Sequence, residues 1–226
     1  MATKLQAIKN GSVKSQVFEA IREAIFSSRF QPGDPLREMH LAKELGVSQV
    51  SVREALVELE HIGLVVRTPN IGSHVTRHTS QEIRERVAIR ELLEAEAAVE
   101  AAQRMSKEDL AELEKRLDAI SEQVAGNNYF AAAQADLEFH RFIWERSGNQ
   151  TLYRMLDQLT VPLFAFASIM RSSGMENLKS TVKSHDVIVR ALKKGDPQKI
   201  REIIRGHIKT SYDQFLVARE TRHSKR

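Results

Sequence analysis

Apolar residues near the start of the chain recur with the spacing of one helix face. The repeat occurs every four positions and is formed by Val13, Val17, Ile21 and Ile25. The helix that it predicts ends before Pro32. A second helix is expected over residues 38–45, since Gly46 follows at a position where a positive φ commonly ends a helix. Ser48 is a suitable N-cap for a third helix that runs to about His61.

Two short strand-like runs follow these helices. Residues 64–67 and 73–76 are rich in Val and Thr and flank a Pro-Asn-Ile-Gly turn. Three helices and a small hairpin in this order predict a winged helix-turn-helix, which we place in residues 1–78. From there on, apolar residues follow the helical period, with breaks that separate six or seven helices. We therefore predict a mainly α chain whose residues 79–226 form an all-α helical bundle.

Composition narrows the class of protein. The chain has no cysteine, which excludes disulfides and cysteine-ligated zinc fingers. It has no apolar run of about 18 residues, so no membrane span is expected. The N-terminus lacks the apolar stretch of a secretory signal, and a cytoplasmic location is expected. The net charge of +4 permits nucleic-acid binding without requiring it.

The second and third predicted helices have the pattern of a helix-turn-helix. Small and apolar residues hold the positions that pack two helices across a tight turn: Ala42, Gly46, Val47, Val52 and Leu56. The opposite face carries short polar groups and one arginine: Ser48, Gln49, Ser51 and Arg53. Such a face can enter a major groove and meet base edges and phosphates. A plain helical hairpin with a solvated face is the alternative, and the wing that follows favours DNA binding.

Four ionisable residues fall on apolar faces of the predicted bundle helices: Asp136, His140, His185 and His207. A buried charge without a partner is costly, so these residues should satisfy one another or a bound group. Three neutral imidazoles and one carboxylate form a good site for a divalent transition metal with open coordination positions. The residues alone leave a second interpretation open, in which the histidines are satisfied core residues.

The N-terminal motifs resemble those of GntR-family regulators. The resemblance covers residues 17–76 and is carried by QPGDPL, LAKELGVS, VREAL and LVVRTPNIGSHV. It implies a homodimer on a palindromic operator, with the recognition helix and the wing tip on the DNA. The residues implied to face DNA are Ser48, Gln49, Ser51 and Arg53, with Asn70, Ile71, Gly72 and Ser73 at the wing tip. Gly72 would let the backbone approach the minor groove closely.

Two positions depart from this family pattern. Gln49 stands where the family usually has arginine after the recognition-helix Ser or Thr, and Met39 stands where it has another arginine. Arg37 lies near Met39, and we include it among the DNA-binding residues. Arginine pairs bidentately with guanine whereas glutamine prefers adenine, so we expect an operator that differs from the common consensus of the family.

Residues 80–215 resemble the ligand-binding domain of the FadR-type subgroup, in the metal-binding variant of its FCD domain. The motifs are DxxxH followed by RSGNQTL, a histidine before ALKKGD, and a histidine in the last helix. The resemblance implies that the metal ligands are Asp136, His140, His185 and His207. Zn or Ni is the expected metal, with Mn as a further candidate. Ser184 departs from the family, which usually has Glu before the third ligand.

The same resemblance implies a small carboxylate effector on the open positions of the metal. Cations should complete such a pocket, because arginine pairs bidentately with a carboxylate. The candidates are Arg90, Arg171 and, as a weaker one, Asn149. Each arginine could instead form a surface ion pair, and Asn149 could be a turn or cap residue.

These inferences together predict a dimeric transcription regulator that binds a specific DNA sequence. We expect it to be a repressor whose activity is controlled by a small organic acid. Effector binding at the metal would change the relative orientation of the two DNA-binding domains. One alternative is a metal sensor, in which the metal itself is the signal. Another is a metal-dependent hydrolase, although HExxH, GxSxG and P-loop patterns are absent from the sequence. A regulator that binds a fatty acyl chain in a metal-free pocket is disfavoured by the three histidines.

Overall fold

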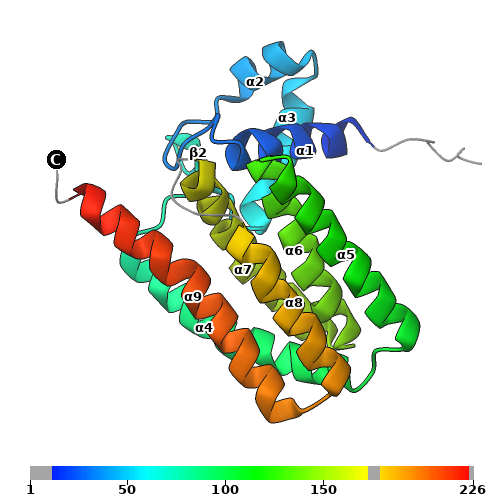
Figure 1. Ribbon diagram of the computed structural model, residues 1–226. Helices are drawn as coiled ribbons and strands as arrows, with labels where there is room; N and C mark the ends of the chain where they lie inside the picture. The colour runs from blue at the N-terminus through cyan, green and yellow to red at the C-terminus, as the bar shows by residue number, and fades with distance from the viewer. Residues whose placement is uncertain (1–11, 173–178, 224–226) are drawn as a thin grey trace, which may run out of the picture.

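A computed structural model describes residues 12–172 and 179–223 of the chain (Figure 1). The N-terminal part contains α1 (Val13–Phe26), α2 (Glu38–Leu45), α3 (Gln49–His61), β1 (Val65–Thr68) and β2 (Gly72–Val75). The C-terminal part contains α4 (Ser80–Ala102), α5 (Lys107–Ala125), α6 (Tyr129–Arg146), α7 (Gln150–Ser172), α8 (Lys179–Lys194) and α9 (Pro197–His223). The predicted mainly α fold, with a winged helix-turn-helix followed by a helical bundle, is confirmed.

Local side-chain chemistry sets where several helices begin and end. The Ser48 hydroxyl caps α3 by accepting the backbone N–H of Ser51 at 3.1 Å. Thr79 and Glu82 form a reciprocal capping box at the start of α4. Gly46 ends α2 with a φ of 65°. These signals depend on residues that are close together in the chain. For this reason the sequence pattern predicted the bounds of the helix-turn-helix to within a few residues.

The wing is tied to the segment that precedes α2. Strand β1 pairs antiparallel with β2, and Val65 lies opposite Val75 in this register. The N–H of Leu36 donates to the backbone oxygen of Ser73 at 2.8 Å. The hairpin is therefore held beside the start of α2, and both flank a groove of about 850 Å³.

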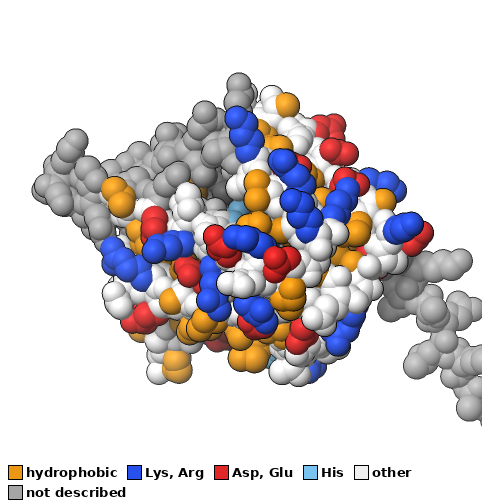
Figure 2. Space-filling model, turned by 60° about the horizontal axis from the view of Figure 1, so that its bottom comes forward, with side chains coloured by type: hydrophobic (Ala, Val, Ile, Leu, Met, Phe, Trp, Pro, Cys, Tyr) orange, Lys and Arg blue, Asp and Glu red, His pale blue; other side chains and the backbone are white. Residues whose placement is uncertain are grey.

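The helices of the bundle run roughly parallel to one another (Figure 1). α4 and α9 lie side by side at one edge, and α5 packs on α6 at the other. Figure 2 shows Lys and Arg side chains interspersed with Asp and Glu over one face of the molecule. None of the helices in the described part is both long enough and apolar enough to cross a membrane.

Helix α7 joins the bundle to the N-terminal part of the chain. One apolar cluster contains Ile25 and Phe26 of α1 together with Leu156 and Phe164 of α7. The Ser168 hydroxyl, buried on α7, donates to the backbone oxygen of Phe26 at 2.8 Å. The two parts therefore share packing and a buried hydrogen bond, and α7 makes contacts with both.

We expect Gly63→Ala to destabilise the protein at this junction. Gly63 has a φ of +76°, and an added Cβ would lie 3.0 Å from Cγ of Pro162 on α7. Gly195→Ala is the matched control, because Gly195 has a φ of +71° in open space. The control should lose about 1–2 kcal/mol of unfolding free energy from left-handed strain. The overpacked Gly63→Ala should lose about 1–3 kcal/mol more.

Urea denaturation of both variants measures these losses. Equal losses for the two variants would show that the Pro162 contact contributes no additional strain.

Candidate metal centre and nucleic-acid interface

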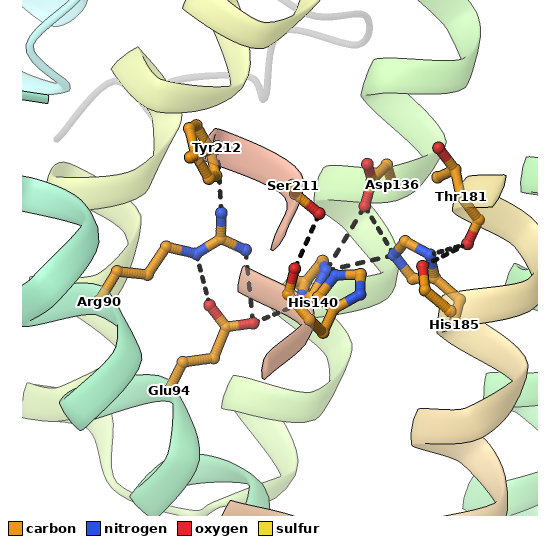
Figure 3. Close-up of polar contacts among 10 residues, drawn as sticks. Arg90, Glu94, Asp136, His140, Thr181, His185, Ser211 and Tyr212 are labelled. Carbon is orange, nitrogen blue, oxygen red and sulfur yellow. Dashed lines mark hydrogen bonds and ion pairs between the residues drawn. The ribbon is translucent and has the colours of Figure 1, made fainter. Parts of the chain in front are cut away.

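Three helices of the bundle bring three histidine side chains together, and Figure 3 labels two of them, His140 and His185. His140 lies on α6, His185 on α8 and His207 on α9, and one ligand atom of each lies within 4.8 Å of the others. Asp136, one turn before His140, places Oδ1 2.9 Å from Nε2 of His185 and 3.4 Å from Nε2 of His140. The structure thus gathers the four residues that the sequence predicted as metal ligands.

Contacts on the outer side of two rings orient them toward the cluster. Nδ1 of His185 lies 2.7 Å from the backbone oxygen of Thr181, which can only accept, so Nδ1 carries the proton. Ser184 donates to the same oxygen at 2.7 Å. Nδ1 of His140 contacts the carboxylate of Glu94. Both rings therefore direct Nε2 inward, and an outer partner holds each ring as in known histidine–metal sites.

Three polar atoms meet at the centre of the cluster. Nε2 of His140 lies 3.3 Å from Nε2 of His185, and Oδ1 of Asp136 is close to both. Atoms that carry lone pairs repel one another at these distances unless a proton or a metal cation lies between them. Nδ1 of His207 is also buried, without a hydrogen-bond partner among the described residues. The three imidazoles in this arrangement could hold a divalent transition metal, and the Asp136 carboxylate lies beside two of them.

Glu94 connects the histidine cluster to a buried arginine. Arg90 Nε donates to Glu94 at 2.6 Å, and Arg90 Nη1 donates to the Tyr212 hydroxyl at 3.1 Å. Burial raises the pKa of the Glu94 carboxyl, but Arg90 and then His140 outweigh burial and hold that pKa well below its usual range. Glu94 is therefore charged at neutral pH. We did not predict it, although its spacing four residues after Arg90 on an alanine-rich face was a usable signal.

The histidines differ in their protonation. Burial lowers the pKa of His207 well below its usual value, and the neighbouring His185 and His140 lower it further. Burial also lowers the pKa of His140, but Glu94 and Asp136 outweigh burial and raise that pKa overall. His207 is therefore a neutral imidazole with a lone pair to offer.

The cavity beside the histidines is almost filled by side chains. Its volume of about 10 Å³ is the space of roughly one water molecule. Arg90, which the sequence predicted to bind the effector, lines this cavity, and Glu94 and Tyr212 already bond its guanidinium. The guanidinium also lies over the Phe164 ring, 4.9 Å from its centroid. An organic acid would therefore have to displace side chains in order to enter.

The other two residues predicted to bind the effector lie elsewhere. Asn149 is exposed at the start of α7, where its Oδ1 accepts the Leu152 N–H at 3.1 Å, so it serves as a helix cap. It is not among the described residues that line the cavity. Arg171 belongs to the last turn of α7, and its side chain lies outside the described part of the structure.

The face of α3 predicted to read DNA is turned to solvent. Ser48, Gln49 and Arg53 are exposed, and Ser51 is half-buried. The hydroxyls of Ser48 and Ser51 lie 2.9 Å apart, within the cap of the helix. Gln49 and Arg53 both bond to Glu38 of α2, which the sequence analysis did not single out. The geometry thus places the predicted side chains on one surface at the N-terminal half of α3.

The groove between α2 and the wing continues this surface. Arg37, Asn70 and Gly72 line it, and all three are exposed. Asn70 and Gly72 have φ values of 63° and 106°, which form the tight turn at the wing tip. Ser73 differs from the expectation, because its side chain is buried and its backbone oxygen already accepts from Leu36.

Models of two protein families match the two parts of the chain. The model of the bacterial regulatory proteins of the gntR family matches residues 13–75, and that of the FCD domain matches residues 85–210. The chain belongs to the GntR family. With its FCD domain it is a DNA-binding transcriptional regulator of the FadR-type subfamily, and this family consists of regulators rather than enzymes.

Named relatives and solved structures agree with this assignment. The probable D-xylose utilization operon transcriptional repressor of Paenarthrobacter nicotinovorans is 32% identical over 197 residues, covering 87% of this chain and 86% of that protein. The HTH-type transcriptional repressor RspR of Escherichia coli K12 is 25% identical, covering 92% and 91%. The solved structure of E. coli McbR/YncC shares the fold, with a TM-score of 0.77 at 24% identity, covering 91% of this chain and all of that one.

Proposed function

We propose that this GntR-family protein is a homodimeric repressor whose operator binding is controlled by a small organic acid at a metal site. Asp136, His140, His185 and His207 would hold the metal, with Zn, Ni or Mn as candidates. The observation that carries the proposal is the convergence of Asp136 Oδ1 with inward-facing histidine nitrogens. A bound metal would supply a Lewis-acidic cation with open positions for a carboxylate oxygen.

Arg90 is the effector-binding residue that the geometry supports best. Its guanidinium is buried beside the histidines and is held by Glu94 and Tyr212. An entering carboxylate would compete with Glu94 for this guanidinium and would push aside Phe164, which packs under it. Arg171, at the end of α7, is a second candidate cation. Asn149 already serves as a cap, which makes it the weakest candidate.

Helix α7 offers a route from this pocket to the DNA-reading part. The Phe164 ring lies 5.8 Å from the His140 ring, between centroids, on the pocket side of α7. On the same helix, Ser168 bonds to Phe26 of α1 and Pro162 lies against Gly63. A shift of Phe164 would therefore act on a helix that holds the DNA-reading part. A dimer on a palindrome needs half-sites about one helical turn apart, so a small reorientation weakens binding.

We assign repression because two of the named relatives are described as repressors. The proposed domain division, 1–78 for DNA binding and 79–226 for metal, effector and dimerisation, follows the break between β2 and α4. The charged, side-chain-filled pocket offers an acyl chain little space, and this favours a small polar acid over a fatty acid.

The test is operator binding of the full chain, measured by fluorescence anisotropy on a duplex obtained by binding-site selection. The protein is stripped with EDTA, reloaded with Zn, Ni or Mn, and titrated with a panel of small carboxylic acids. We expect one class of acid to raise the operator Kd about 5–150-fold, and only in the metal-loaded protein.

The other outcomes separate the alternatives. A change in Kd upon metal loading alone, with no response to any acid, would identify a metal sensor. Operator binding that is indifferent to metal and to every acid would overturn the proposed switch while leaving the DNA-binding assignment intact.

A further inference from the structure

Glu38, the first residue of α2, lies against the DNA-facing side of α3. Its carboxylate accepts hydrogen bonds from two residues of that helix at once. Gln49 Nε2 lies 3.0 Å from Glu38 Oε2, and Arg53 Nη2 lies 2.8 Å from the same oxygen. Arg53 Nε completes the arrangement at 3.2 Å and 3.1 Å from Oε1 and Oε2. Glu38 of α2 thus holds the two longest polar side chains at the start of α3, those of Gln49 and Arg53.

The contact with Glu38 decides which way the Gln49 amide faces. A carboxylate only accepts hydrogen bonds, so the amide nitrogen, and not the amide oxygen, must face Glu38. That nitrogen carries two hydrogens, and Glu38 takes one of them. When Glu38 takes the hydrogen on the side away from the amide oxygen, the amide oxygen and the other hydrogen remain as a pair on one edge of the group. Such a pair is what binds the N6 and N7 atoms of adenine in the major groove.

The same reasoning applies to the guanidinium of Arg53. Glu38 occupies the edge formed by Nε and Nη2. The remaining edge, formed by the outer hydrogens of Nη1 and Nη2, keeps two parallel donors. Two parallel donors on one edge match O6 and N7 of guanine. Arg53 is half exposed, with 53% of its side-chain surface accessible, so this second edge can reach a ligand.

We infer that Glu38 is a positioning residue for base recognition, which holds Gln49 and Arg53 as one unit that reads an adenine and a guanine close together. The two side chains are one helical turn apart, about 6 Å along α3, which corresponds to roughly two base-pair steps. The inference rests on the proposed role of Gln49 and Arg53 in facing DNA. Glu38 adds a negative charge at a phosphate-rich interface, which a purely electrostatic contact surface would avoid.

The test compares base preferences of full-length variants by selection from a randomised duplex pool, followed by Kd measurements. Glu38→Gln should reduce discrimination at the adenine and guanine positions about tenfold each. Affinity for non-specific DNA and the slope of log Kd against log salt should be unchanged, or non-specific affinity should rise slightly, because no phosphate contact is lost. The thermal melting temperature of each variant provides the folding check.

Glu44→Gln is the matched control. Glu44 is also an acid of α2 in a partly exposed ion pair, but it pairs with Arg29 outside α3. The substitution makes the same change of charge on the same helix, and base preference should not change. A Glu44→Gln variant with the same loss of discrimination as Glu38→Gln would show that charge, and not positioning, is responsible.

A double-mutant cycle distinguishes positioning from direct contact. In a Gln49→Ala background, Glu38→Gln should cause no further loss at the adenine position. A further loss there would mean that Glu38 touches a base itself, and unchanged preferences in Glu38→Gln alone would also overturn the inference. Gln49→Ala and Arg53→Ala variants that both keep the original preferences would instead refute the premise that these side chains read bases.

Discussion

We expect Glu94→Ala to lower the free energy of unfolding by about 3–5 kcal/mol relative to the unchanged protein. Glu94 is 1% exposed and is the charged partner of Arg90, which is 2% exposed. Removing the carboxylate takes away the main charged partner of the buried guanidinium, which keeps its hydrogen bond to the Tyr212 hydroxyl and a weaker attraction to Asp136. Burying an uncompensated charge is among the largest penalties that a single substitution can impose.

A second ion pair on the same helix supplies the control. Glu96 is a neighbouring acid of α4 and binds Arg201 of α9 through two contacts, at 2.7 Å and 2.8 Å. Both partners are well exposed, so Glu96→Ala should change the free energy of unfolding by no more than about 1 kcal/mol. Two arginine–glutamate pairs with similar distances are thus expected to differ severalfold in their effect on stability, because only one pair is desolvated.

Urea denaturation in the presence of EDTA measures both variants without a contribution from metal loss. A loss for Glu94→Ala no larger than that for Glu96→Ala would mean that water or another group reaches Arg90. The assignment of Glu94 and Arg90 as a closed buried pair would then be wrong.

His185→Ala should weaken zinc binding by more than 100-fold. Loss of an outer partner of a ligand typically costs 10–100-fold in metal affinity, and loss of the ligand itself should cost more. His185 lies at the middle of the cluster, because its Nε2 contacts both Asp136 and His140. Removing its ring therefore removes two contacts of the cluster at once, the one with Asp136 and the one with His140.

Competition with a chromophoric chelator gives the zinc affinity, and thermal unfolding gives a second readout. Zinc should raise the melting temperature of the unchanged protein, since a ligand that binds only the folded state stabilises it, but not that of His185→Ala. His40→Ala is the control, because His40 is an exposed histidine of α2. Equal zinc affinities for His185→Ala and the unchanged protein would place the metal elsewhere.

Much of this architecture could be predicted because its signals are local. The Ser48 cap, the Gly46 turn and the apolar period of α1 each involve residues a few positions apart. The structure places each where the sequence indicated, except that Val13, in the first turn of α1, is 50% exposed. The same period put Asp136, His140, His185 and His207 on inward faces of their helices. A helix face can be predicted from one sequence because side-chain direction repeats every 3.6 residues.

The contacts that give these residues their chemistry come only from the packing of distant helices. Asp136 meets His185 across 49 positions of the chain, and Arg90 meets Tyr212 across 122. Periodicity indicates that a side chain faces inward, but not which side chain of another helix it will meet. For this reason helical periodicity did not indicate Glu94 as the partner of His140, or Glu38 as the partner of Gln49 and Arg53.

The sequence by itself determined the order of the elements, the two-part organisation and the residue types available for a metal and for DNA. The tertiary structure decided that Arg90 is held by Glu94, that the pocket is nearly full, and that α7 touches both parts. The physical reason is the range of the forces involved. Caps and helix faces depend on neighbouring residues, whereas the enclosure and charge state of a buried group depend on every helix packed against it.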